Sequence, residues 1–248
     1  MSLTENIDKA LTDRPYQFFP SVESTNDLAM VWLNEGTRAG SVIVADEQTR
    51  GRGRLGRTWY APPGTALMMT YILRPAIEDL PYVGMMGALA VCEALRSLGV
   101  ERCGIKWPND VQIDGRKVCG VLPEAAWQNN RLLGVILGVG INIRVDFTGT
   151  ALETTAISLD TVIPGIDRAE LLRRLAARMD FWSQRLSSDD LFERWRGALV
   201  MLQRRVSINH VTGTVEGVAE SVDRQGALLV RDATGMLRHV IAGDIALG

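Results

Sequence analysis

One long apolar stretch near the middle of the chain limits the possible folds more than any other feature. The segment RLLGVILGVGINI (131–143) contains few polar side chains and follows the pair Asn129–Asn130, which is typical of a turn. Strands of this character are found at the centre of a sheet. Just before it, Asp114–Gly115 separates two alternating runs, which predicts a β-hairpin with a type I′ turn. We therefore expect a sheet with residues 131–143 as a central strand.

Helical patterns surround the predicted strands. Residues 24–36 are predicted to form a helix whose apolar stripe consists of Leu28, Val31 and Trp32. Residues 80–99 have several apolar faces, so they should form a well-buried helix. Two further runs, SVIVAD and TALMMTYIL, have strand composition.

The last third of the chain changes character. Residues 167–186 are predicted to be a helix that begins at the capping residue Asp167, with Glu170 three residues later as in a capping box. From about residue 203, short strands are divided by Gly, Asp and Gln, as in a small β-barrel. We therefore predict an α+β protein: a mixed central sheet flanked by helices in residues 1–202, and a C-terminal barrel in residues 203–248.

Charge and composition exclude several classes of protein. The chain has 27 basic and 29 acidic side chains, which argues against a surface built as a whole for nucleic acid. No apolar run approaches the roughly 18 residues of a membrane helix, and the N-terminus lacks the apolar core of a signal peptide. The three cysteines show no CxxC spacing, which favours reduced, buried thiols over zinc. We expect a cytoplasmic protein.

The densest local charge lies in TRGRGRLGRTW (49–59), which contains four arginines and three glycines. Its GRGRLG matches the dinucleotide fingerprint, but Pro62 and Pro63 follow where that motif needs a helix. Ordering a glycine-rich loop costs roughly 1–2 kcal/mol per residue, whereas each charge-assisted arginine contact contributes roughly 1.5–3 kcal/mol. We therefore interpret the segment as a loop that is mobile when empty and ordered by an anion.

A second polar group occurs in KWPND (106–110). Pro108 favours an extended conformation for Trp107, so the chain should leave its strand abruptly here. Lys106, Asn109 and Asp110 then lie together at a strand end. A carboxylate and an amide beside a phosphate site suit Mg²⁺, but Asn-Asp is also common in plain turns, and both interpretations stay open.

Two further features complete a pocket. A lysine in a hairpin arm is usually exposed, but Lys117 lies beside the apolar run CGVL and could direct its charge into an apolar pocket. In GVGIN (138–142), glycines interrupt a central strand, which indicates close approach of a ligand or of backbone, and Asn142 adds a donor and an acceptor. Apolar walls, two lysines, a carboxylate and an arginine-rich lid together favour nucleotide-dependent activation of a carboxylic acid.

These motifs resemble those of the biotin–protein ligases (biotin–[acetyl-CoA-carboxylase] ligases). The matching segments are ESTND, DEQTRGRGRLGRTW, KWPND, GRKVCGVLPE, LGVGINI, DRQGALLV and AGDIAL, in the order of that family. The resemblance implies a class II synthetase-like catalytic domain with an SH3-like C-terminal barrel. It also implies two half-reactions: biotin and ATP give biotinyl-5′-AMP and pyrophosphate, and a lysine of a biotin carboxyl carrier protein then displaces AMP.

The resemblance also assigns roles to individual residues. The catalytic residues would be Arg54, Lys106 and Lys117. The biotin contacts would be Ser24, Thr25, Asn26, Gln48, Gly51, Arg52, Lys117, Gly120, Leu122 and Gly140. The ATP and adenylate contacts would be Arg52, Arg54, Arg57, Trp59, Lys106, Asn109 and Asn142, and Asp110 would serve Mg²⁺.

Three residues depart from the family pattern. Leu55 replaces a frequent arginine and Cys119 a usual alanine, and we expect neither to change the chemistry. Pro123 replaces a β-branched residue and removes a ladder donor, so we expect a bulge or strand end there, just before Glu124.

Alternatives stay open on sequence alone. A lipoate or octanoate ligase shares the general fold, although the full arginine-glycine loop argues against it. A nucleic-acid-binding protein that uses this loop is a more remote alternative. About 20 residues precede the first motif, too few for the helix-turn-helix of family members that repress transcription, so we expect no DNA role. Family analogy favours a homodimer.

Overall fold

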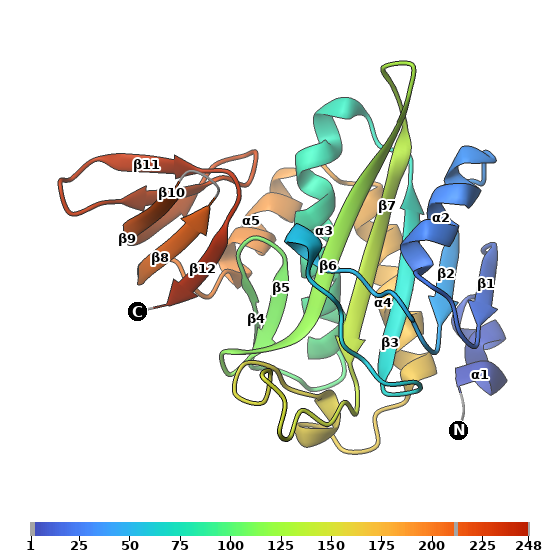
Figure 1. Cartoon of the computed structure of the whole chain (residues 1–248). Coiled ribbons are helices and arrows are strands. Elements are labelled where there is room, and N and C mark those ends of the chain that lie inside the picture. Colours follow the sequence, from blue (N-terminus) through green and yellow to red (C-terminus); the bar gives the residue numbers. More distant parts are fainter. Residues whose placement is uncertain (1–2, 211–212, 248) are drawn as a thin grey trace.

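A seven-stranded mixed sheet forms the centre of the molecule (Figure 1). The computed structural model describes residues 3–210 and 213–247. The strand order is β1-β2-β3-β7-β6-β5-β4; β1 and β2 are parallel and the remaining pairs antiparallel. The strands are β1 (Tyr16–Phe19), β2 (Val42–Ala45), β3 (Ala66–Leu73), β4 (Cys103–Lys106), β5 (Asp110–Ile113), β6 (Arg116–Gln128) and β7 (Arg131–Asn142).

Helices cover the two faces of this sheet unequally (Figure 1). On one face α2 packs alone over a small apolar cluster, and on the other face α3 packs on the strands over the main core, with α4 and α5 against α3. Part of the α2 face is therefore left for a site. The helices are α1 (Leu3–Ala10), α2 (Thr25–Asn34), α3 (Leu80–Arg96), α4 (Arg168–Ser183) and α5 (Asp189–Ala198), with short 3₁₀ turns η1 (Arg54–Gly56), η2 (Ile77–Asp79) and η3 (Leu159–Thr161).

The prediction of a central apolar strand is confirmed, since β7 is fourth of the seven strands. Both predicted turns occur. Asp114 and Gly115 have φ of 50° and 79° between β5 and β6, and Asn129 and Asn130 have φ of 49° and 60° between β6 and β7. A type I′ turn has a positive φ at both central residues, which Gly, Asn and Asp adopt more readily than other residues.

The predicted apolar stripe of α2 is confirmed in part. Leu28 and Trp32 are half-buried and pack against the apolar cluster beneath the helix, but Val31 is 51% exposed. The fully buried residues of the helix are Ala29 and Leu33, together with Thr25 and Asn26. The small Ala29 lets the helix approach the sheet closely. The two polar residues are buried because they form hydrogen bonds at the sheet surface, which a search for apolar periodicity does not detect.

The structure also differs from the expected bulge or strand end at Pro123. Strand β6 continues through Pro123, which pairs with Leu137 of β7, and the register shift lies further on, between Ala126 and Trp127. Two residues earlier, Val121 donates its backbone N–H to the carbonyl of Asn109, on the side away from β7. Residues two apart in a strand direct their N–H groups to the same side, so the N–H that Pro123 lacks would also point away from β7. No hydrogen bond to β7 is therefore lost.

At the start of α4, Asp167 accepts from the backbone N–H of Ala169, as predicted for a cap. Glu170 does not complete the capping box. Its carboxylate binds Arg173 and Arg174 instead, and the bond from Arg173 lowers the pKa of Glu170 to about 2. Two arginines on the next turn offer stronger charge-assisted bonds than one backbone N–H.

The C-terminal residues form a separate five-stranded antiparallel sheet with order β11-β10-β9-β8-β12, consistent with an SH3-like domain. It docks on the main domain through Trp107, which is 1% exposed and whose indole Nε1 donates to the carbonyl of Gly226 at 2.8 Å. The predicted division at residues 202 and 203 stays a prediction. The strands are β8 (Arg205–His210), β9 (Gly213–Val222), β10 (Leu228–Arg231), β11 (Leu237–Val240) and β12 (Asp244–Leu247).

We expect Trp107→Phe to lower the free energy of unfolding by about 1–3 kcal/mol, because the half-buried carbonyl of Gly226 loses its donor. Urea unfolding followed by fluorescence measures the change. Trp127→Phe is the matched control, since Trp127 is half exposed at the tip of the β6–β7 hairpin. Equal destabilisation by both substitutions would contradict a docking role for Trp107.

No membrane span is found among the helices of residues 3–210 and 213–247, because none is both long enough and apolar enough.

Candidate active site

A cavity of about 420 Å³ opens on the α2 face of the central sheet. Its floor consists of strands β5, β6 and β7, one wall is the start of α2, and the arginine-glycine loop (residues 49–59) covers it. Segment 152–156 and Asp244 of the C-terminal domain complete the rim. Sequence segments far apart in the chain therefore meet at one site.

Glycines make the floor of the cavity flat. Gly120 of β6 and Gly140 of β7 are cross-strand partners, and the indole of Trp59 lies over both. A Cβ atom on Gly140 would lie 2.6 Å from Trp59, and one on Gly120 would lie 3.2 Å from the same ring. The buried Nε1 of Trp59 has no hydrogen-bond partner among residues 3–210 and 213–247. The indole thus forms an apolar inner wall that still has one donor to offer.

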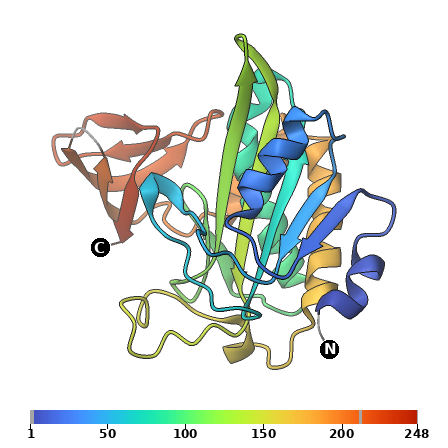
Figure 2. The same cartoon turned by 45° about the vertical axis from the view of Figure 1, so that its right-hand side comes forward.

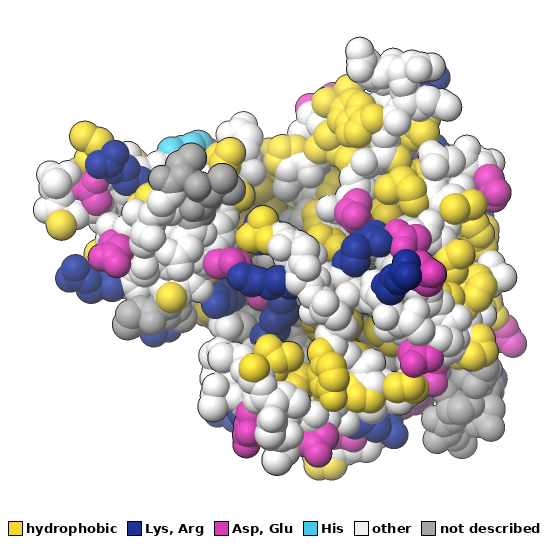
Figure 3. Space-filling view, in the orientation of Figure 1, with side chains coloured by type: hydrophobic (Ala, Val, Ile, Leu, Met, Phe, Trp, Pro, Cys, Tyr) yellow, Lys and Arg dark blue, Asp and Glu magenta, His cyan; other side chains and the backbone are white. Residues whose placement is uncertain are grey.

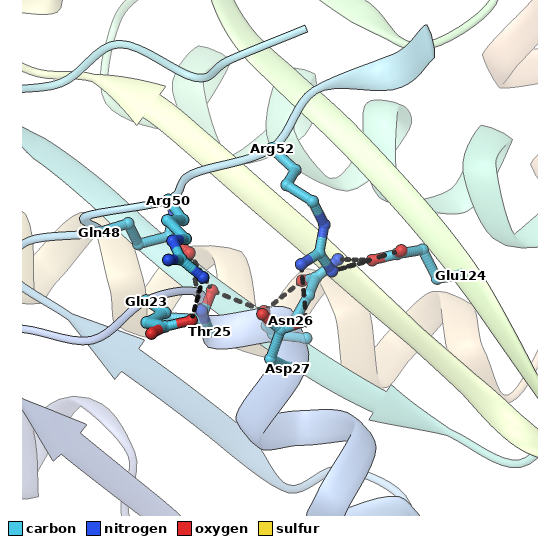
Figure 4. A network of polar contacts seen from close by, with 9 residues as sticks. Glu23, Thr25, Asn26, Asp27, Gln48, Arg50, Arg52 and Glu124 are labelled. Carbon is cyan, nitrogen blue, oxygen red and sulfur yellow. Dashed lines mark hydrogen bonds and ion pairs between the residues drawn. The ribbon is translucent and has the colours of Figure 1, made fainter. Parts of the chain in front are cut away.

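A network of buried polar groups lines the end of the cavity next to α2 (Figure 4). Gln48 accepts from the backbone N–H and the hydroxyl of Thr25, at 2.7 and 3.0 Å. Thr70 on β3 donates to Oδ1 of Asn26 at 2.6 Å. Ser24, 3% exposed, precedes the helix and forms no side-chain cap bond. Hydroxyl and amide groups on rigid elements make this end suitable for a small polar ring.

The same network extends to the covering loop (Figure 4). The amide of Asn26 donates to Glu124 on β6, and Glu124 also binds Arg52 at 3.4 Å. Arg52 forms a closer bond to Asp27 at 2.6 Å, and this bond raises the pKa of the arginine. Arg52 therefore joins the loop to both α2 and β6.

The opposite end of the cavity carries positive charge. Nζ of Lys117 lies 2.7 Å from Asp110 and 5.8 Å from the centre of the Trp59 ring. Lys106, the last residue of β4, lies opposite Asp110, the first residue of β5, in the antiparallel ladder. Asn142 donates to the carbonyl of Lys117 at 3.3 Å, while its buried Oδ1 has no partner in the part of the chain that the structure describes. Two lysines and a free amide acceptor suit a nucleotide, with its phosphates and donor groups.

Each arginine of the covering loop contacts a different part of the molecule. Arg50 binds Glu23 at 3.1 Å, and Arg54 donates to Asn109 at 3.0 Å. Partial burial lowers the pKa of Arg54, although the charges of Asp110 and Asp244 oppose this shift. Arg57 pairs with Asp244 of the C-terminal domain, and the loop lies next to this domain in Figure 2. Basic side chains gather in the middle of this face, interspersed with acidic ones (Figure 3).

The structure brings nearly all the predicted site residues to this one cavity. Gly51 is the exception, because it is buried behind Trp59 and accepts the backbone N–H of Trp59 at 2.9 Å. A Cβ on Gly51 would lie 3.1 Å from the Trp59 carbonyl, so this glycine serves loop packing. The predicted residues that line the cavity are Ser24, Thr25, Asn26, Gln48, Arg52, Arg54, Arg57, Trp59, Lys106, Asn109, Asp110, Lys117, Gly120, Leu122, Gly140 and Asn142.

Sequence reasoning missed several residues of the site. Gly138 lies two positions before Gly140, so the period of two in a strand places both on the cavity face. Gln112 lies two positions after Asp110 on β5, and its buried Oε1 has no partner among the described residues. The alternation of each strand was a usable signal for both. Thr70 and Asp244 carry no such signal, since only tertiary contacts bring them to the network and to the loop.

Comparison with known proteins decides the family. Residues 18–142 match the model of the biotin/lipoate A/B protein ligase family, and residues 202–248 match the biotin protein ligase C-terminal domain. The chain belongs to the biotin protein ligase family. This ligase is 34% identical over 242 residues to the biotin–[acetyl-CoA-carboxylase] ligase of Paracoccus denitrificans, covering 91% of this chain and 98% of that protein.

Further relatives agree. The ligase is 30% identical over 237 residues to the bifunctional ligase/repressor BirA of Bacillus spizizenii, covering 92% of this chain and 72% of the relative. Its fold matches the biotin protein ligase from Aquifex aeolicus in complex with biotin and ATP, with a TM-score of 0.79, 25% identity, and coverage of 94% of this chain and 98% of that one. The predicted fold class and enzyme class are thus confirmed.

Proposed function

We propose that this ligase joins biotin to ATP, giving biotinyl-5′-AMP and pyrophosphate, and then transfers biotin to a lysine of a biotin carboxyl carrier protein. One observation carries the proposal. A single cavity connects a pocket of hydroxyl and amide groups near α2, through the apolar wall of Trp59, to the charges of Lys106 and Lys117. That order of groups matches biotin, whose polar ring, apolar chain and carboxylate follow one another.

In the first half-reaction, a carboxylate oxygen of biotin attacks the α-phosphorus of ATP, and the bond to the bridging oxygen breaks as pyrophosphate leaves. Lys106 and Lys117 would neutralise the charge that develops on the phosphoryl and carboxyl oxygens. Arg54 and Arg57, with Trp59, Asn109 and Asn142, would bind the nucleotide. The remaining polar residues and the floor glycines would hold biotin: Ser24, Thr25, Asn26, Gln48, Arg52, Gly120, Leu122 and Gly140.

In the second half-reaction, the amine of the carrier lysine attacks the acyl carbon, and AMP leaves with the electrons of the broken bond. The proton of the attacking amine passes to solvent. His239 supplies no base here, since it binds Asp223 in the C-terminal domain, outside the cavity. Closure of the arginine-glycine loop would keep water from the mixed anhydride between the two steps.

The residues at the cationic end also fit Mg²⁺ that arrives with ATP. Within residues 3–210 and 213–247, no cluster of three or more His, Cys, Asp or Glu side chains is arranged to hold a metal by itself. Mg²⁺ commonly takes one carboxylate with phosphate and water oxygens, and Asp110 offers that carboxylate beside Lys117. The ion would neutralise phosphate charge.

The release of pyrophosphate tests the first half-reaction. Biotin, lipoate and octanoate are supplied separately with Mg-ATP, and without a carrier protein. Release with biotin alone is the expected result. Release with lipoate or octanoate but not biotin would favour the alternative acyl ligase, while no release with any of them would overturn the proposed activity.

The cellular location, the oligomeric state and the binding partners of the enzyme are part of the proposal. We infer a cytoplasmic enzyme, because ATP and carrier proteins are found there. A homodimer and the absence of DNA binding stay predictions. Sedimentation velocity tests the first, and a DNA-binding assay at low salt tests the second and also the alternative of a nucleic-acid-binding protein, since such binding is strongest at low salt.

We expect Arg54→Gly to allow adenylate formation but to release biotinyl-5′-AMP about tenfold faster or more, because a charge-assisted contact to the adenylate is lost. Filter binding of the labelled adenylate measures the release. Arg50→Gly is the control in the same loop, since Arg50 is exposed and pairs with Glu23 outside the cavity. Tighter retention in Arg54→Gly would contradict the lid model.

A further inference from the structure

The covering loop is anchored at its two ends, through the backbone of Arg50 and the indole of Trp59. Its tip is a small hairpin in which Arg52 pairs with Thr58, and Gly53 donates its N–H to the carbonyl of Arg57 at 2.7 Å. Residues 52–58 are exposed or half-buried, in contrast to the buried Gly51. Side-chain contacts of the arginines therefore decide where the tip lies.

One of these contacts crosses to the other domain. Both terminal nitrogens of Arg57 bind the carboxylate of Asp244, with Nη1 to Oδ1 at 3.2 Å. Asp244 also lines the rim of the cavity. Of the arginines in the loop, Arg50, Arg52 and Arg54 bind residues of the main domain.

The position of Asp244 is fixed independently of the loop. It is the first residue of β12, and its backbone lies opposite that of Asn209 in the ladder with β8. The preceding Gly243 packs so closely that a Cβ atom would lie 2.6 Å from Ile208 and 3.0 Å from the carbonyl of Asn209. The bond from Trp107 to Gly226 is one of the contacts that join the C-terminal domain to the main core. A carboxylate on a strand of the C-terminal sheet thus meets an arginine on a glycine-rich loop.

We propose that Asp244 is a positioning residue through which the C-terminal domain holds the arginine-glycine loop over the cavity. The consequence for catalysis rests on the proposed function: the contact keeps the loop closed and so reduces escape of the adenylate. Asp244 acts through Arg57 and takes no part in the chemistry. The C-terminal domain accordingly does two things: it docks on the main domain, and it holds the loop closed over the cavity.

The size of the effect follows from the exposure of the pair. The side chain of Arg57 is 65% exposed and that of Asp244 38%, and partly exposed ion pairs shift an equilibrium only several-fold. We expect Asp244→Asn to increase loop opening about two- to fivefold. Asp244→Glu keeps the charge and should restore most of the closed population.

Limited trypsin digestion of the protein alone measures loop opening, because the loop carries the cleavage sites Arg50, Arg52, Arg54 and Arg57. Mass spectrometry identifies cuts within residues 50–57. Faster cutting there in Asp244→Asn, and near-normal cutting in Asp244→Glu, is the expected result. Glu220→Gln is the control, since Glu220 forms an exposed ion pair with Arg231 in the same domain, away from the cavity. Near-UV circular dichroism checks that each variant is folded.

Release of labelled biotinyl-5′-AMP gives a second readout, with faster release from Asp244→Asn than from Glu220→Gln as the expected result. Loop cutting in Asp244→Asn no faster than in Glu220→Gln would overturn the positioning role, even if the adenylate forms normally. Faster loop cutting in a chain that forms no adenylate would support the positioning role while the proposed function fails. The protease experiment needs neither biotin nor ATP, so the two failures can be told apart.

Discussion

Replacement of Lys117 by alanine should reduce the rate of adenylate formation by about 10²–10³, the usual loss when one preorganised charge at a reacting centre is removed. The ammonium group lies between Asp110 and the Trp59 ring, at the end of the cavity where phosphate and carboxylate would meet. Its charge matters most when negative charge develops on those oxygens. Single-turnover measurement of biotinyl-5′-AMP formation gives the rate.

Stability should change little in this variant. The pair with Asp110 is partly exposed, 36% for the lysine side chain and 26% for the aspartate, so its loss costs at most about 1 kcal/mol. Arg116→Ala is the control, since the adjacent Arg116 is exposed on the same strand and should leave the rate unchanged. A collapse of the melting temperature in Lys117→Ala, with normal activity per folded molecule, would contradict the assignment.

Replacement of Gly138 by alanine should weaken biotin binding by about ten- to a hundredfold. A Cβ atom at this position would lie 2.4 Å from Oδ1 and 2.9 Å from Nδ2 of Asn26, so the amide must turn away. It then loses its bonds to Thr70 and Glu124. Each buried hydrogen bond contributes about 0.5–1.5 kcal/mol, and 1.4 kcal/mol corresponds to a tenfold change in affinity.

Isothermal titration of biotin, without ATP, measures this effect. Gly197→Ala on α5 is the matched control, because a Cβ atom there meets nothing within 4 Å. Unfolding must be measured for both variants, since the loss of two bonds also affects stability. Unchanged biotin affinity in a folded Gly138→Ala protein would remove Asn26 and its network from the biotin site.

Local patterns were sufficient for a large part of the fold. The two turns follow from Asp-Gly and Asn-Asn, which tolerate positive φ, and the central strand follows from an apolar run that is typical of a sheet interior. The cap at Asp167 is likewise a local interaction. Patterns failed where a polar residue is buried, as for Asn26 on α2, because its burial depends on partners distant in sequence.

The candidate site divides in the same way. The sequence by itself indicated which segments line the candidate site, since an arginine-glycine loop, two lysines and a carboxylate can be recognised from residue type and spacing. Tertiary structure alone decided that these segments share one cavity, that Gly51 packs behind Trp59, and that Gly138 leaves room for Asn26.

It alone also brought Asp244 to Arg57, across 187 positions of sequence. The physical reason is the separation in sequence over which each kind of interaction acts. Turn and strand preferences act between neighbours in the chain, whereas hydrogen bonds, ion pairs and close packing act between whichever groups the folded chain brings within a few ångströms.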